Sequence, residues 1–308
     1  MTTPSTVDGT DDRDGSLSAA FAAGVAVTAR RPLLALVPLL AGLTSISQFE
    51  RAARADVAFQ VNFGFPAPVA GLWTFLDAPL PDGLTAFGTP LGTVREQPEL
   101  LATAVLAAAG GLLLVGLLTA VYLGAIDDVL AGRETDHRDN LRRHAPVTLA
   151  FAALELLGLL ALVAVTLGVS GAGRPRAPVL LVPAVLGALV ALYLLTPGVY
   201  VGVAADLTPL VAFRRGLDIA LTGAYLLFAL AHAAVVAVVS VPLSALAFSA
   251  GPLSLLLGAL VVALPGLALN AATMAFVRQR VTGADAPGTP DRRSPPTPAV
   301  RRVPDEER

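Results

Sequence analysis

The chain has 308 residues, of which 55% are hydrophobic and 14% are charged, and its formal net charge is -2. A soluble domain carries about 25% charged residues, so this composition excludes an ordinary solvated surface and favours a lipid bilayer as the surrounding medium. The absence of cysteine excludes disulfides and thiol chemistry, and the small net charge excludes a basic field for nucleic acid.

Polar sequence occupies both ends of the chain. Residues 1–15 are acidic and residues 281–308 are rich in Pro, Arg and Asp, so both are predicted to be disordered tails. Residues 16–280 are predicted to form one membrane domain. Every basic residue is Arg, none is Lys, and Asp outnumbers Glu. This bias resembles the composition of proteins from extremely halophilic archaea.

Six apolar runs predict an all-α fold, a polytopic membrane helix bundle with six transmembrane helices. A spanning helix needs about 20 apolar residues, whereas a barrel strand needs only about 10. The longest run is divided at Gly251-Pro252, which is a turn signal. The predicted spans are residues 33–49, 100–126, 146–169, 178–203, 219–247 and 252–277.

The arginines predict the orientation of these spans. One alternating set of connections, together with both tails, carries 16 of the 21 arginines, and the other set carries 5. Cytoplasmic connections are enriched in Lys and Arg. The protein is therefore predicted to lie in the plasma membrane with its N-terminus and C-terminus both inside the cell.

Two short amphipathic helices are predicted to lie in the membrane interface. One covers residues 16–30, and the other begins at Pro209 with Thr208 as its N-cap. In the second helix Leu210, Phe213 and Leu217 share one face, while Arg214 and Arg215 are predicted to contact lipid phosphates. An alternative is that these arginines only anchor the next span.

The two interfacial segments share a short pattern, which suggests a weak internal repeat. Ala20-Phe21-Ala22-Ala23-Gly24-Val25 aligns with Ala212-Phe213-Arg214-Arg215-Gly216-Leu217 as Ala-Phe-x-x-Gly-aliphatic. Each copy precedes a predicted span that leaves the cytoplasm.

The second interfacial segment also carries a resemblance to known proteins. Asp206, Pro209, Ala212, Arg214 and Arg215, set between two apolar runs, resemble a signature of six-helix integral membrane families of unknown function. These families include the membrane domain fused to some glycerophosphodiester phosphodiesterases. The resemblance implies a fold. It implies no catalytic residue, because the fused enzymes carry their chemistry in a separate domain.

The candidate site is an intramembrane polar pair, Glu155 and His232. Glu155 lies about 13 Å into its span, near the midplane of a ~30 Å core, and His232 lies at a similar depth. An ionisable residue at that depth is a functional hypothesis by default. The two side chains could form a proton-relay or substrate-binding pair, or they could only hydrogen-bond helices together. Asn270 is predicted to form an interhelical hydrogen bond.

No other pattern predicts a catalytic, cofactor-binding or metal site. Ser170 and His232 lie at different depths, so they cannot form a nucleophile and its base. The segment from Asp127 to His144 could bind a metal but is predicted to be a solvated, mixed-charge loop, and the connection 50–99 is predicted to lie on the outer membrane surface.

The sequence therefore predicts a non-enzymatic integral membrane protein that organises the membrane or supports another membrane protein. The lipid bilayer is its predicted partner. The alternative is a transporter of a small solute or a lipid-like molecule that uses Glu155 and His232.

Overall fold

The computed structural model describes residues 11–43, 48, 52, 60–76, 85–86, 89–90, 98–171, 177–249 and 252–284. Helices account for most of them, and the two strands form one short antiparallel pair. The elements are α1 (Asp11–Arg30), the 3-10 helix η1 (Pro32–Ala35), α2 (Leu36–Leu43), α4 (Leu72–Phe75), β1 (Thr85–Ala86), β2 (Thr89–Pro90), α6 (Pro98–Ala131), α7 (His137–Gly171), α8 (Ala177–Ala204), α9 (Pro209–Ala220), α10 (Gly223–Phe248) and α11 (Pro252–Ala284).

The structure confirms the predicted class of fold, an all-helical protein with several helices that are long and apolar enough to cross a membrane. Among the described residues, five helices are long and apolar enough to cross a membrane: α6, α7, α8, α10 and α11. A sixth crossing arises if residues 17–30 and 32–42 count as one broken span, because these two helices meet at a bend of 100°. Many leucines on the outer faces of these helices are exposed, as a surrounding hydrocarbon requires.

The first predicted span differs most from the observed helices. Residues 33–49 were expected to form one helix, but the chain forms η1 and then α2, which ends at Leu43. Pro32 at the start of η1 supplies a fixed φ and no N–H donor, which favours a fresh helix start after the bend. Most of residues 44–59 lies outside the described part of the chain.

The predicted span over residues 219–247 begins too early, because residues 219–220 end α9 and α10 begins only at Gly223. Other predicted spans are too short. α6, α7 and α11 each extend beyond the apolar run, because helix hydrogen bonding continues into polar sequence after the hydrocarbon ends. Residues 11–15 and 281–284 are helical, so the two predicted disordered tails, residues 1–15 and 281–308, each include several residues that belong to a helix. Residues 1–10 and 285–308 lie outside the described part.

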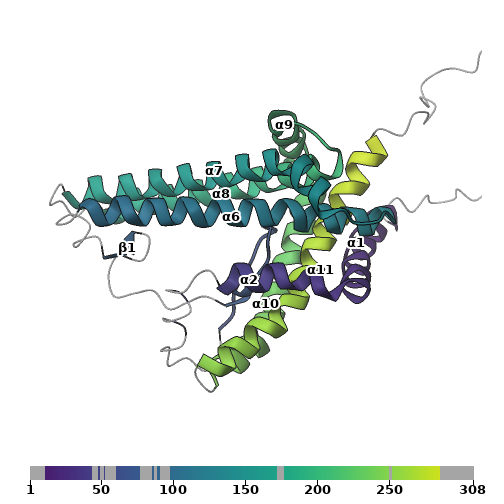
Figure 1. Cartoon of the computed structure of the whole chain (residues 1–308), viewed down its shortest axis with the longest axis horizontal. Coiled ribbons are helices and arrows are strands. Elements are labelled where there is room, and N and C mark those ends of the chain that lie inside the picture. Colours follow the sequence, from purple (N-terminus) through teal and green to yellow (C-terminus); the bar gives the residue numbers. More distant parts are fainter. Residues whose placement is uncertain are drawn as a thin grey trace, which may run out of the picture.

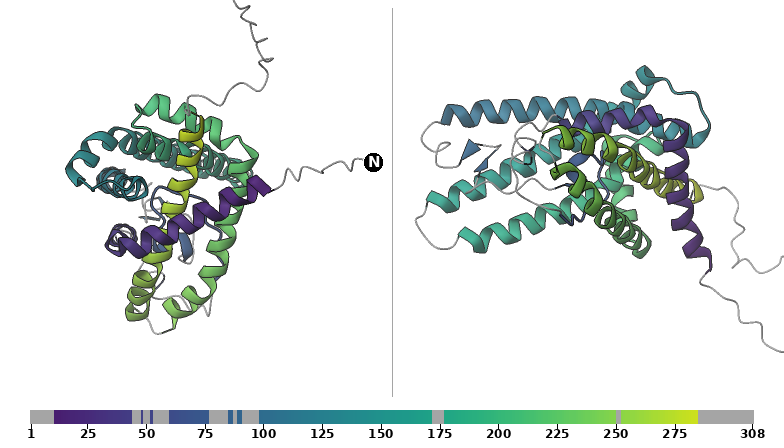
Figure 2. Two further views of the ribbon diagram at one scale, coloured as in Figure 1. Left: turned by 90° about the vertical axis from the view of Figure 1, so that its right-hand side faces the viewer. Right: turned by 90° about the horizontal axis from the view of Figure 1, so that it is seen from below.

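Three long helices, α6, α7 and α8, run side by side and form one arm of the molecule (Figure 1). α10 and α11 cross this arm at an angle, and α1 lies across α11 (Figure 2). The α6–α7 connection, α1 and the last turns of α11 share the right-hand end of Figure 1. We call this the arginine end, because Arg133, Arg143 and Arg278 lie there.

The internal repeat found in the sequence corresponds to two similar helix crossings. Ala20 and Ala212 are both fully buried. A Cβ atom added to Gly24 would overlap the α11 backbone at Ala268, and one added to Gly216 would overlap the α8 backbone at Gly198. In each copy the glycine therefore allows a short helix to pack directly against the backbone of a long one.

The predicted helix at Pro209 forms as α9, and it also packs against α8, a contact not predicted from the sequence. Thr208 occupies the N-cap position and Pro209 the first helical position. The buried residues are Ala212, Gly216 and Ala220, four residues apart, whereas Leu210 and Leu217 are exposed. Small residues form this face because α9 packs closely against α8, and Phe213 lies beside Gly198 at the same contact. The exposed Leu210 and Leu217 agree with an apolar side turned toward lipid.

Candidate functional site

Residues 60–76 form an inserted segment that runs between the long helices. Leu72, Phe75 and Leu76 within it are buried in a hydrophobic cluster with α10 and α11. The prediction that this connection lies on the outer surface was therefore wrong for residues 60–76, although Phe63 and Phe65 are exposed. Non-helical backbone is tolerated beside membrane helices only when its polar groups are satisfied by protein or water.

Two serines of α10 satisfy the first part of this backbone. The Gln60 N–H donates to Ser244 Oγ at 2.8 Å, and Ser244 Oγ donates to the Gln60 carbonyl at 3.1 Å. The Asn62 N–H donates to Ser240 Oγ at 3.0 Å. Two residues of extended chain advance about as far as one turn of helix, roughly 6 Å, so the two elements keep a common register.

Asn270 of α11 holds the far end of the inserted segment. Its Nδ2 donates to the Ala67 carbonyl at 2.7 Å and the Pro68 carbonyl at 3.2 Å, and its Oδ1 accepts from the Ala70 N–H at 2.8 Å. Asn270 also bonds Tyr200 of α8 and Tyr122 of α6, which confirms the predicted interhelical hydrogen bond. The side chain is fully buried, so one amide fixes three helices and the inserted segment together.

A small cavity of about 120 Å³ lies beside the tip of the inserted segment. The tip contributes Ala67, Pro68 and Val69 to its wall. The polar side chains that line it are Thr119 of α6 and Thr148 and Glu155 of α7. The remaining lining residues are Val115, Phe151 and Val199.

A larger apolar groove of about 370 Å³ adjoins this cavity along α6, α7 and α8. Glu155 and Phe151 belong to the walls of both. The other groove residues are Leu112, Leu154, Gly158, Leu159, Leu162, Ala188, Ala191, Leu192 and Leu195. We call the groove and the cavity together the compartment. Its groove is apolar apart from Glu155, its cavity has three polar side chains, and Glu155 belongs to the walls of both.

The structure does not bring the predicted pair Glu155 and His232 together. Both ring nitrogens of His232 are buried without a hydrogen-bond partner, and its ring lies against Phe228, with ring centroids 6.1 Å apart. His232 lines neither the cavity nor the groove. Within the described residues, Glu155 likewise has no hydrogen bond or ion pair.

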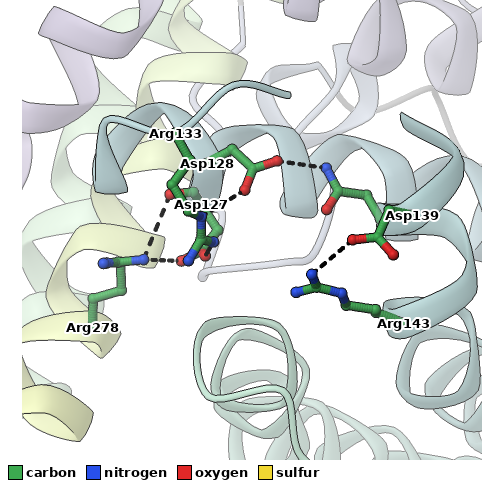
Figure 3. Close-up of polar contacts among 7 residues, drawn as sticks. Asp127, Asp128, Arg133, Asp139, Arg143 and Arg278 are labelled. Carbon is green, nitrogen blue, oxygen red and sulfur yellow. Dashed lines mark hydrogen bonds and ion pairs between the residues drawn. The ribbon is translucent and has the colours of Figure 1, made fainter. Parts of the chain in front are cut away.

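The segment from Asp127 to His144 is the predicted solvated loop only in part. Residues 132–134 and 136–138 are exposed, whereas Asp127, Asp128, Asn140 and His144 are buried, and the first three of these belong to a polar network. Asp127 and Asp128 lie within the last five residues of α6, which ends at Ala131, and are almost fully buried. Asp127 accepts from Arg278 of α11 and from Arg133 at 2.6 Å, and Asp128 accepts from Arg133 at 3.0 Å and from Asn140 at 2.8 Å (Figure 3). The described residues include no group of three or more His, Asp or Glu side chains suited to a metal ion.

Beside this network, Asp136 caps the first turn of α7. Its Oδ1 accepts from the backbone N–H groups of Asp139 at 3.1 Å and Arg138 at 2.9 Å. These two bonds favour the ionised carboxylate and lower the pKa of Asp136 below its ordinary value. The cap therefore fixes where α7 begins at the arginine end.

The predicted lipid-contacting residues Arg214 and Arg215 lie on the exposed side of α9. The contact of these arginines with lipid phosphates stays a prediction. The Ser170 side chain lies outside the described residues.

Sequence reasoning missed the inserted segment, Ser240, Ser244 and the threonines of the cavity. A signal existed for the serines, which are spaced four residues apart on one face of an apolar span. Polar residues repeated on one face of a membrane helix need a polar partner. The sequence does not identify that partner, because the inserted segment is about 180 residues distant along the chain.

These features define an all-helical, membrane-embedded protein with a cavity that holds an unpaired carboxyl group. No protein-family model, curated protein or solved structure matches the chain. The resemblance to the membrane domain fused to glycerophosphodiester phosphodiesterases therefore stays a prediction.

Proposed function

We propose that the protein is a carrier that takes a lipid-like molecule from the bilayer into the compartment at Glu155. The observation that carries this proposal is that Glu155 lines both the apolar groove and the polar cavity. A molecule with an alkyl chain and a polar head matches both parts at once. Of the two functions predicted from the sequence, this is the transporter alternative, without His232.

Glu155 stands near the middle of α7. It lies about 18 Å along the helix axis from Arg143, which marks the arginine end. A carboxyl group placed in the hydrocarbon region costs about 2.5 to 3.5 kcal/mol when it is charged. Intramembrane ionisable residues that face a cavity mark substrate or ion pathways. A bound polar head would supply the partner that no described residue provides.

The proposal includes a multi-pass topology in the cell membrane with six spans and both termini inside. The bias of 16 against 5 arginines supports this orientation. The 100° bend between α1 and α2 supports α1 as an interfacial helix that leads into the first span. Arg133 and Arg278, which bind Asp127 together, would then face the cytoplasm.

The non-enzymatic character predicted from the sequence is kept in this proposal, which assigns no chemical reaction to the compartment. A membrane-organising role is a second candidate. It is supported by Arg214 and Arg215, which lie exposed on α9 beside Leu210 and Leu217, where phosphates and acyl chains could bind together.

Filling the groove is expected to prevent uptake of the alkyl chain. Gly158 lines the groove and has no neighbour within 4 Å of a Cβ atom added to it. Gly158→Trp should therefore occupy the groove without disturbing helix packing. We expect photolabelling of the groove by a diazirine-bearing hexadecanol, in purified protein reconstituted into nanodiscs, to fall at least about fivefold; mass spectrometry would locate the label on α7 and α8.

The matched control is Gly110→Trp, which adds the same side chain to an exposed position of α6 outside the groove. It should leave labelling of the groove unchanged. Equal labelling along all lipid-facing helices, unaffected by Gly158→Trp, would mean that the groove holds only surrounding lipid, and the carrier proposal would be wrong.

A further inference from the structure

We infer that the head group bound in the cavity is a protonated primary amine, so that the ligand is an alkylammonium. This inference rests on the proposed function and assigns it a substrate class. It follows from the kinds of polar group that line the cavity and from the places where their hydrogen atoms are already used.

The threonine hydroxyl groups that line the cavity already donate their hydrogens to backbone carbonyls of their own helices. Thr119 Oγ1 donates to the Val115 carbonyl at 2.7 Å. Thr148 Oγ1 lies 3.2 Å from the carbonyls of both His144 and Ala145. Both threonines are buried. Each oxygen therefore faces the cavity as a hydrogen-bond acceptor.

The side-chain donors nearest the tip of the inserted segment are occupied as well. Tyr200 donates its hydroxyl hydrogen to the Ala67 carbonyl at 2.7 Å. The Asn270 Nδ2 group donates its two hydrogens among three acceptors, the Ala67 and Pro68 carbonyls and the Tyr200 hydroxyl oxygen. Pro68 has no N–H group. The side chains around the cavity are thus arranged to accept hydrogen bonds and not to donate them.

No basic side chain lines the cavity or the groove. Arg278 and Arg133 are bound to Asp127, which lies about 12 Å further along α6 than Thr119. A negatively charged head group would therefore meet Glu155 without a compensating charge. A protonated amine carries three N–H donors and a positive charge, which match two hydroxyl oxygens and one carboxylate.

A metal ion fits the compartment less well than an amine. The cavity presents a single carboxylate, whereas hard cations take six to eight oxygen ligands. A metal ion would also leave the apolar groove without a function. A quaternary ammonium group fits the charge but offers no N–H donor to the threonines.

Displacement of the hexadecanol photolabel by four twelve-carbon compounds tests the inference. The compounds are dodecylamine, dodecyltrimethylammonium, dodecanol and dodecanoate, measured on the reconstituted protein at neutral pH. Dodecylamine is expected to displace the label at a concentration at least about tenfold lower than dodecanol or dodecanoate requires, with the quaternary ammonium between them.

Two variants show whether the preference arises from the cavity or from partitioning into lipid. Glu155→Gln keeps the shape of the side chain and removes its charge, so the ratio of dodecanol to dodecylamine concentrations should fall to about 1. Thr119→Val removes one acceptor and should lower the ratio in part. Gly110→Trp, outside the compartment, should leave it unchanged. Thermal unfolding of each variant identifies loss of fold.

The outcomes separate this inference from the proposed function. If no compound displaces the label, both are overturned. If dodecanoate or dodecanol displaces it as well as dodecylamine does, the compartment still takes up an alkyl chain but the amine assignment is wrong. A tenfold preference that persists in Glu155→Gln would attribute selectivity to the bilayer, which also overturns the inference.

Discussion

Replacing Asp127 with Asn is expected to lower the free energy of unfolding by about 3 kcal/mol, because it leaves Arg278 and Arg133 without their shared buried partner. The Asp127 side chain is 3% exposed and the Arg278 side chain 23%. Removing one member of a buried pair typically costs about 3 to 5 kcal/mol. The lower figure applies here, because Arg133 is 54% exposed and can turn toward water.

Thermal unfolding in detergent measures this effect, and we expect Tm to fall by at least about 5 °C. Asp139→Asn is the matched control, since it makes the same chemical change in the Asp139–Arg143 pair at the same end (Figure 3). Both partners of that pair are about half exposed, so its loss should cost no more than about 0.5 kcal/mol. Equal losses in the two variants would contradict the buried network.

Replacing Asn270 with Leu is expected to release the inserted segment from the helix bundle. The substitution leaves the Ala70 N–H, the Pro68 carbonyl and the Tyr122 hydroxyl without a partner in the interior. Each unsatisfied buried group costs about 1 to 3 kcal/mol, so the free energy of unfolding should fall by about 3 kcal/mol. The segment can instead recover hydrogen bonds by withdrawing toward water.

Hydrogen exchange followed by mass spectrometry distinguishes release of the segment from general unfolding. In Asn270→Leu, exchange in residues 60–76 should rise at least about tenfold, while α6 and α7 keep their protection. Thr196→Val is the control, because Thr196 is also buried but bonds only the Leu192 carbonyl of its own helix. Unchanged exchange in residues 60–76 would show that Asn270 does not hold them.

Hydropathy predicted most of the membrane helices because an apolar run of about 20 residues has few alternatives to a spanning helix. Residues 100–126, 146–169, 178–203, 219–247 and 252–277 all lie largely within observed helices. The ends of these helices could not be predicted, because a helix can continue into polar sequence. The position of a charged residue therefore does not identify the last backbone hydrogen bond of the helix. Asp127 and Asp128 show this, since the sequence indicates loop residues there but both lie inside α6, which ends at Ala131.

The candidate site could be predicted only in part, because its residues come from distant segments. Glu155 was identified since it is the only formal charge in its apolar run. His232 was paired with it on depth alone, and depth does not define which face of a helix a side chain occupies. The tip at Ala67 and Pro68 carries no chemical signature, so its position beside Glu155 follows only from the anchors Asn270 and Tyr200.

The face by which a helix packs against its neighbour also could not be predicted from the positions of the large apolar residues. In α9 the sequence indicated an apolar side formed by Leu210, Phe213 and Leu217, and two of these, Leu210 and Leu217, are exposed. It did not indicate the contact with α8, where Ala212, Gly216 and Ala220 are buried and Phe213 lies beside Gly198. The hydrophobic effect does not sort side chains within a lipid environment, so close contact of small residues determines which face packs. The shared Ala-Phe-x-x-Gly pattern was the better guide.

Cross-linking of paired cysteines in the native membrane tests most directly whether the inserted segment reaches the compartment at Glu155. The natural chain contains no cysteine, so only introduced thiols react. Val69 and Val115 line the same cavity, whereas Leu113 lies on the outer side of α6 and is 53% exposed. We expect Val69→Cys to cross-link with Val115→Cys and not with Leu113→Cys. Absence of the first cross-link, together with ready labelling of residue 69 by a membrane-impermeant maleimide, would contradict this expectation.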